Sequence, residues 1–209
     1  MFFQIRYDGS FVTRIDQLVK GTLVALLAVA ALAASLALAT GPAPQDCAGS
    51  PRAPALDHVI LAVGDLDRAD SPFRANGFRL KQGRLHANNL LNRHIKFRDG
   101  TSIELMTVRG TPRVALARDY AHLLATAEGG VYVALNVPDA EAPARAAAEQ
   151  GLETIRSSSG PWSFVSFPPE SPAAAVFFSA GTATVRDPDS LLSHAPGVVG
   201  LAEVWLEGG

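Results

Sequence analysis

The chain contains two copies of one unit. Three pairs of equivalent positions are each separated by 74 residues: His58 and Tyr132, Asp65 and Asp139, and Gly77 and Gly151. Solenoid repeats are shorter, at about 20 to 50 residues, so a unit of this length holds several strands and a helix. We therefore expect one domain made of two paired units, with the functional site between them, where equivalent side chains meet from two sides.

Composition excludes several classes of protein. Hydrophobic residues make up 48% of the 209 residues and charged residues 18%, which is too apolar for a disordered chain. The formal net charge is −2 and no cluster of like charges stands out, so we expect no nucleic-acid partner. The single Cys47 excludes an internal disulfide and a cysteine-built zinc site.

The first 40 residues contain an apolar run. Residues 22–39 are almost wholly Leu, Ala and Val, and Arg14 and Lys20 precede them. This length is close to the about 20 residues that cross a bilayer, and the cationic flank keeps the start of the run in the cytoplasm. We interpret residues 1–40 as an apolar helix that serves as a signal peptide or a membrane anchor.

The protein is therefore expected to be exported and extracytoplasmic, or anchored to the cytoplasmic membrane by residues 22–40. The length of the run favours an uncleaved transmembrane helix, whereas its small residues and the Gly41-Pro42 break favour a cleaved signal. Residues 41–54 are rich in Pro and Gly, which is typical of a linker.

The first unit spans residues 55–110. We predict strands over 56–63, 78–82, 93–98 and 101–108. The helix is expected to start near Asp70 or Ser71, because Pro72 is unfavourable beyond the first turn, and to end at Gly77. Asp99-Gly100 predicts a two-residue type I′ turn. The alternation of His94 with apolar neighbours suggests that His94 faces solvent.

A connecting helix over residues 111–128 leads into the second unit, residues 129–181. There we predict a strand over 131–137, a helix over 139–150, and strands over 153–155, 163–167 and 174–179. Residues 200–206 start the unit a third time, with Glu203 in the position of His58. This terminal strand either completes the sheet of the second unit or begins a further unit.

These motifs resemble the vicinal oxygen chelate superfamily, and within it the glyoxalase-like domain proteins. The resemblance covers roughly residues 55–206. It rests on Leu56-Asp57-His58-Val59 with Asp65, Asn92 ahead of Asp99-Gly100-Thr101-Ser102-Ile103-Glu104-Leu105, Glu128-Gly129-Gly130, and His194-Ala195-Pro196-Gly197. It implies an α+β fold in which two paired βαβββ units form a curved mixed sheet around a cleft.

The resemblance also implies a metal site. Metal-using members take their ligands from the first and fourth strands of both units, and His58 and Glu104 occupy those positions in the first unit. It implies a divalent ion, such as zinc, nickel, iron or manganese, and a catalytic role for Glu104. Nitrogen and carboxylate oxygen donors suit such ions.

The second unit supplies no equivalent ligands. The position of His58 is taken by Tyr132, and that of Glu104 by Phe178, or by Phe177 if the longer second turn shifts the register by one. Two ligands are fewer than the three usual in a catalytic zinc site. Glu203 is the candidate third ligand, either in the same molecule or through a strand exchanged within a homodimer. The alternative is a hydrogen-bonded core His58 and a Glu104 paired with an arginine.

Two functions remain open. The first is an exported, metal-assisted lyase or isomerase acting on a small carbonyl compound. The second is a non-catalytic module that binds or sequesters a small molecule and retains a degenerate metal site. In both, the expected pocket residues are Asn92, Tyr132, Trp162 and Phe178.

Overall fold

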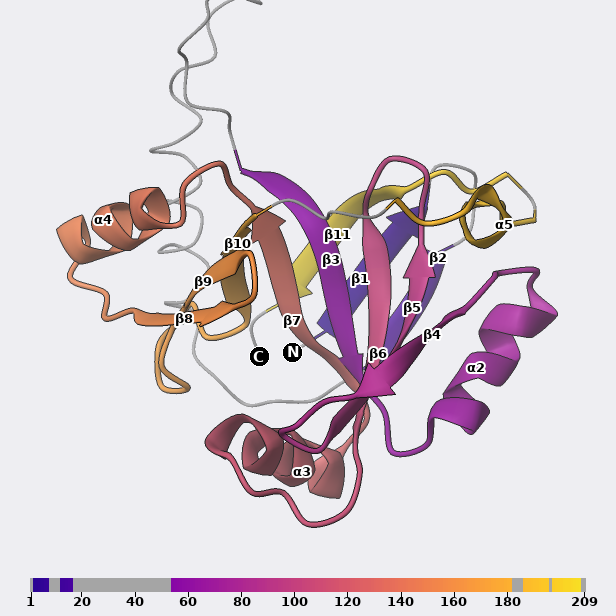
Figure 1. Ribbon diagram of the computed structural model, residues 1–209, viewed down its shortest axis with the longest axis horizontal. Coiled ribbons are helices and arrows are strands. Elements are labelled where there is room, and N and C mark those ends of the chain that lie inside the picture. The colour runs from indigo at the N-terminus through magenta and orange to yellow at the C-terminus, as the bar shows by residue number, and fades with distance from the viewer. Residues whose placement is uncertain (1, 8–11, 17–53, 182–185, 196, 208–209) are drawn as a thin grey trace, which may run out of the picture.

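The computed structural model describes residues 2–7, 12–16, 54–181, 186–195 and 197–207 (Figure 1). The apolar run at residues 22–40, and almost all of the expected linker at 41–54, lie outside the described residues. In the part of the chain that is described, no helix is long and apolar enough to cross a membrane.

Both units have the predicted order of elements. The first contains β3 (Ala55–Ala62), α2 (Leu66–Ala75), β4 (Lys81–Leu85), β5 (Leu90–Lys96) and β6 (Ser102–Val108). The second contains β7 (Gly129–Asn136), α4 (Glu141–Glu149), β8 (Ile155–Ser159), β9 (Trp162–Ser166) and β10 (Val176–Ala180). Helix α3 (Ala115–Thr126) connects them.

The two units form one curved, mixed sheet of eight strands in the order β4-β5-β6-β3-β7-β10-β9-β8 (Figure 1). The first strands of the units, β3 and β7, pair antiparallel at its centre, and each pairs in parallel with the last strand of its own unit. The predicted α+β fold with paired βαβββ units is confirmed.

The two faces of this sheet have different coverings. On the outer face, as we name the side covered by α2 and α4, alternate side chains such as Val59 and Leu105 pack beneath α2, and Val165 packs beneath α4. On the opposite, inner face, Ile60 and Met106 pack against α3. Among the described helices, α3 is the one that packs against this face.

Helix α2 begins earlier than predicted. It starts at Leu66, after Asp65, whose carboxylate caps the helix by accepting a hydrogen bond from Arg68 N at 2.9 Å. Pro72 therefore lies inside the helix rather than in its first turn. The expected start near Asp70 is wrong because the cap and the fully buried Leu66 stabilise the first turn despite the proline.

The two edge strands also differ from prediction. Strand β4 lies a few residues later than the predicted strand 78–82, and β8 covers 155–159 rather than 153–155. Both are mostly exposed, so neither has the apolar alternation that marks a strand in sequence.

The β5–β6 hairpin has a longer turn than predicted. Phe97 N donates to Thr101 O at 2.9 Å around a three-residue loop in which Gly100 has a positive φ of 96°, a backbone conformation that glycine adopts readily. A two-residue turn would have placed His94 opposite Leu105. The observed turn places His94 opposite Glu104 instead.

The terminal strand forms part of a second sheet. Strand β11 (Leu201–Glu207) pairs with β1 (Phe2–Tyr7), which pairs with β2 (Val12–Asp16). The alternative in which this strand completes the sheet of the second unit is therefore wrong. Leu201 and Val204 pack against the apolar cluster on the outer face. A short helix, α5 (Asp189–Leu192), precedes it.

The loop after α5 is attached to the first unit by His194. Its Nδ1 accepts a hydrogen bond from Arg79 N at 3.0 Å, and its Nε2 lies 2.7 Å from Lys96 O. The ring is buried against Phe78 and Phe97, and this burial lowers its pKa. His194 is therefore a residue that packs this loop against the first unit.

Candidate functional site

A β-bulge in β3 brings two consecutive polar side chains to the inner face. Leu56 pairs with Leu135 and His58 with Ala134, so Asp57 is the extra residue. The Asp57 carboxylate accepts a hydrogen bond from Ser179 Oγ at 3.0 Å and lies 3.4 Å from His58 Nδ1. Asp57 therefore links the first strand of one unit to the last strand of the other.

Glu104 lies beside His58, as the resemblance implies. Its Oε2 is 3.5 Å from His58 Nε2, and its Oε1 accepts a hydrogen bond from Asn92 Nδ2 at 2.6 Å. The Glu104 side chain is only 10% exposed. Among the described residues, the partners of this buried carboxylate are an amide and two imidazoles, and the expected arginine pairing is not observed.

His94 joins this group, which the sequence did not predict. Its Nε2 lies 3.1 Å from Asn92 Nδ2 and 3.9 Å from Glu104 Oε1. Asn92 Oδ1 accepts a hydrogen bond from Arg84 N, which identifies Nδ2 as the donor, so His94 Nε2 is an acceptor. The prediction that His94 faces solvent is wrong. His94 points away from the apolar core that contains Ile95, but this side of β5 is the inner face of the sheet.

Burial of His94 lowers its pKa to about 4, although the nearby Glu104 carboxylate acts in the opposite direction. The ring is therefore neutral near pH 7. Its Nδ1 is buried without a hydrogen-bond partner among the described residues.

The second unit presents aromatic rings at the equivalent positions. Ala134 pairs with Phe177 just as Ile60 pairs with Glu104, so Phe177 is the structural counterpart of Glu104 and the longer turn has shifted the register by one. The Phe177 ring lies edge-on to His58, with ring centroids 5.6 Å apart. It also contacts Tyr132 and Phe164.

The expected pocket residues are therefore divided between the two faces. Asn92 and Tyr132 lie on the inner face, and Trp162 belongs to the same alternating set of β9 as Phe164. Phe178 is different, because it is 3% exposed in the core beneath α4. The expected place of Phe178 beside Asn92 and Tyr132 is therefore wrong, and Phe177 is the residue of β10 that lies on the inner face.

Two tyrosine side chains, Tyr120 of α3 and Tyr132 of β7, lie together at the inner face. The ring of Tyr120 lies 6.0 Å from that of Tyr132. Burial raises the pKa of both phenols, and the Glu104 carboxylate raises that of Tyr120 further. Both side chains are therefore neutral at physiological pH and contribute an uncharged wall beside Glu104.

The donor set does not fit a catalytic metal ion. Among the described residues, no group of three or more His, Cys, Asp or Glu side chains could hold one. His58 and Glu104 come from the same unit, and the Asn92 amide donates to Glu104 Oε1, one of the oxygens that a cation would need. A catalytic zinc site usually has three protein ligands.

Glu203 does not complete this donor set within the molecule. It lies in β11, where the adjacent Val204 packs against the outer face of the eight-stranded sheet. His58 and Glu104 project from the inner face, on the other side of that sheet. The structure therefore does not bring Glu203 to the pair.

Comparisons with known proteins agree with this architecture. The family model described as a glyoxalase-like domain matches residues 56–208. A methylmalonyl-CoA epimerase structure from Mycobacterium tuberculosis is 20% identical, covers 62% of this chain and 89% of its own, and has a TM-score of 0.50. A hypothetical protein from Bacillus halodurans is 17% identical, covers 65% of this chain and 100% of its own, and has a TM-score of 0.52. No curated protein matches in sequence. The structural likenesses show a shared fold.

Proposed function

Because the chain belongs to the glyoxalase-like domain family of the vicinal oxygen chelate superfamily, we propose that its inner face binds a small carbonyl compound and that Glu104 moves a proton at the carbon next to the carbonyl. The observation that carries this proposal is the buried Glu104 carboxylate, with one oxygen bonded to Asn92 and the other beside His58. This is the chemistry of an isomerase or lyase.

Glu104 is suited to act as the base. Asn92 orients the carboxylate through Oε1, which leaves Oε2 to accept a proton from the substrate carbon. The C–H bond breaks, and its electron pair forms a carbon–carbon double bond while negative charge moves to the carbonyl oxygen. Return of the proton to the same face of the carbon regenerates the substrate, whereas its return to the opposite face would complete an isomerisation.

His58 is suited to stabilise that oxygen. It lies between Asp57 and Glu104, within reach of a carbonyl placed at Glu104. Burial raises the pKa of Asp57, but the hydrogen bonds from His58 and Ser179, together with the charge of His58, outweigh this effect, so its pKa is lowered. The Asp57 carboxylate orients the His58 ring through Nδ1, so that Nε2 faces the position of the carbonyl oxygen and can donate a hydrogen bond to it when it carries a proton.

The aromatic side chains of the second unit provide the binding surface. Tyr132, Phe177 and Trp162 offer apolar area opposite the polar side chains of the first unit, and aromatic rings bind alkyl groups well. This same observation favours a second candidate, a non-catalytic binding module, because aromatic residues occupy the second unit's ligand positions. In both versions, we propose that residues 22–40 direct or anchor the protein outside the cytoplasm.

Deuterium exchange tests the proposal. In D₂O, the full chain is expected to exchange the C3 protons of 2-oxobutanoate, as measured by proton NMR. Glu104→Gln should slow this exchange by about 100-fold or more while preserving binding, because the amide cannot accept the proton. Glu141→Gln, an exposed change on α4, is the control. Exchange that is insensitive to Glu104→Gln would overturn the proposed base, and binding without exchange would support the binding module.

Metal analysis separates this mechanism from the metal-assisted one. We expect the exchange activity to survive dialysis against a chelator, because the donor set lacks a third ligand. Retention of about one divalent ion per chain, lost in His58→Ala, would instead support metal-assisted chemistry.

A further inference from the structure

Lys96 lies beside the proposed reaction centre but takes no part in the proton transfer proposed above. It pairs with Ser102 across β5 and β6, and Ser102 pairs with His58 across β6 and β3. Lys96 Nζ donates a weak hydrogen bond to Ser102 Oγ at 3.3 Å. The lysine is therefore on the inner face, two residues along the strand from the opposed pair His94 and Glu104.

The ammonium group of Lys96 acts on this site electrostatically. Burial is the largest influence on the pKa of both Asp57 and His94, and the nearby positive charge of Lys96 lowers the pKa of each. The charge of Lys96 therefore lies near side chains from two different strands of the site.

Lys96 has no ion-pair partner among the described residues. Across the described ranges, no carboxylate lies at ion-pair distance from its ammonium group, and its hydrogen-bond partner is a hydroxyl. The neighbouring Lys81 differs, because it pairs with Asp187. A half-buried cation beside a base is thus free to bind an anionic group that enters with a ligand.

We propose that Lys96 binds the carboxylate of the substrate, so that the substrate class is a 2-oxo carboxylic acid. This inference rests on the proposed function, since it places the substrate relative to Glu104. Two residues along a strand span about 6.6 Å. In a 2-oxo acid, one carbonyl carbon separates the carboxylate from the carbon that loses its proton, a separation that the flexible lysine stem can accommodate.

The arrangement also orients the rest of the molecule. With the carboxylate at Lys96 and the reacting carbon at Glu104, the carbonyl oxygen lies toward His58. The alkyl end then extends toward the aromatic surface of Tyr132 and Phe177 in the second unit. Each part of a 2-oxo acid therefore meets a side chain of matching chemistry.

The test compares two substrates that differ at one group, a charged carboxylate in one and a neutral amide in the other. The C3 exchange of 2-oxobutanoate and of 2-oxobutanamide is measured by NMR in D₂O as a function of concentration. Wild-type protein should have the lower KM for the carboxylate. Lys96→Gln should raise that KM by about tenfold or more, with little change in kcat, because it removes a charge-assisted hydrogen bond. It should leave the KM for the amide unchanged.

Two variants serve as controls. Lys96→Arg keeps the charge and should retain most of the preference for the carboxylate. Arg145→Gln removes one positive charge from the exposed side of α4. It should leave the KM for both substrates unchanged, which excludes an effect of net charge. Thermal unfolding of each variant checks that it folds. Equal effects of Lys96→Gln on both substrates, or a wild-type preference for the amide, would overturn the role of Lys96.

Failure of the proton-transfer function can be distinguished from failure of the carboxylate site at Lys96. If neither compound exchanges, the proton-transfer function is wrong, and calorimetric titration with the same two compounds decides the inference. Binding of 2-oxobutanoate that is lost in Lys96→Gln but not in Lys96→Arg would still support the carboxylate site. Absence of binding to wild-type protein would refute it.

Discussion

At the two central positions of the inner face, the first unit carries His58 and Glu104, whereas the second carries Tyr132 and Phe177. The backbones around these positions pair in the same way, and both units bury apolar residues on the outer face beneath a helix. The common fold therefore depends on the outer face. The inner-face positions can differ in chemistry because they contribute less to the packed core, and the polar chemistry is concentrated in the first unit.

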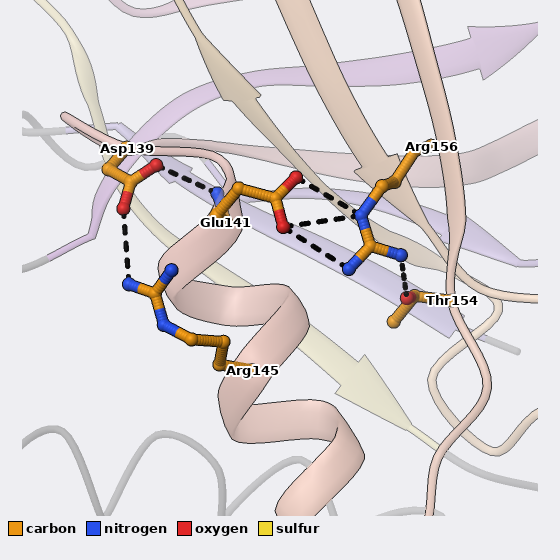
Figure 2. A network of polar contacts seen from close by, with 5 residues as sticks. All are labelled: Asp139, Glu141, Arg145, Thr154 and Arg156. Carbon is orange, nitrogen blue, oxygen red and sulfur yellow. Dashed lines mark hydrogen bonds and ion pairs between the residues drawn. The ribbon is translucent and has the colours of Figure 1, made fainter.

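The helices beside these units show a second contrast. In the first unit, Asp70 of α2 is buried and pairs with Arg93 at 2.5 Å. In the second, Glu141 of α4 pairs with Arg156 on the surface, next to the Asp139–Arg145 pair (Figure 2). The Asp70–Arg93 pair is thus part of the packed structure, whereas the pairs on α4 lie on the surface.

The largest expected effect distinguishes the two faces of β10. Phe178→Ala removes a ring from the core beneath α4 and should lower the free energy of unfolding by about 3–5 kcal/mol. Phe177 lies on the inner face and is partly exposed. Phe177→Ala should therefore lower the free energy of unfolding by less, but it should weaken ligand binding. Chemical denaturation and ligand titration measure both effects. A larger loss of stability for Phe177→Ala would contradict the assignment of the faces.

An intermediate effect is expected for the pH dependence of stability that arises from His94 in the first unit. The pKa of His94 is about 4 in the folded protein and about 6.5 when unfolded, so the unfolded chain binds more protons between these values. The stability that depends on a neutral His94 is fully present above pH 6.5. As the pH falls toward 4, the free energy of unfolding decreases by about 3 kcal/mol in all. Burial lowers the pKa of His194 in the same direction.

Denaturation curves of wild-type protein and His94→Gln between pH 7 and pH 4.5 check this prediction. The wild type should lose stability more steeply, because the carboxylates titrate in both proteins and only the histidine differs. Parallel curves would show that His94 is not buried as a neutral ring.

The smallest effect is expected at the surface pair of the second unit. Glu141→Gln or Arg156→Gln removes an exposed ion pair that solvent and salt screen, so the unfolding midpoint should not change measurably. Thermal unfolding at low and moderate salt is the measurement. A clear loss of stability, abolished by salt, would show that this network is more than a surface contact.

Several features could be predicted because they follow from local patterns. The apolar strands around His58 and Glu104 arise from neighbouring positions in the chain, and the repeat follows from comparing positions 74 residues apart. His94 could have been found in the same way, since it alternates with Ile95 on the strand beside Glu104. Its interpretation failed because periodicity identifies two faces of a strand without saying what covers the second one.

The partner of β11 and the two N-terminal strands could not be predicted in this way. The strong apolar run that follows dominates the N-terminal sequence, and no local signal indicates that residues 2–7 pair with residues 201–207. Glu203 was expected near His58 because of its place in the repeat. Pairing with β1 places its strand on the other side of the sheet.

The sequence alone determined that this protein is a duplicated α+β domain with two polar side chains, His58 and Glu104, in otherwise apolar strands, because helix and strand periods are local properties. Only the tertiary structure decided that His94 lies beside Glu104 and Asn92, that Lys96 lies on the same face, and that Phe177 rather than Phe178 faces these side chains. These outcomes depend on turn lengths and strand register, where a shift of one residue moves a side chain to the opposite face of the sheet.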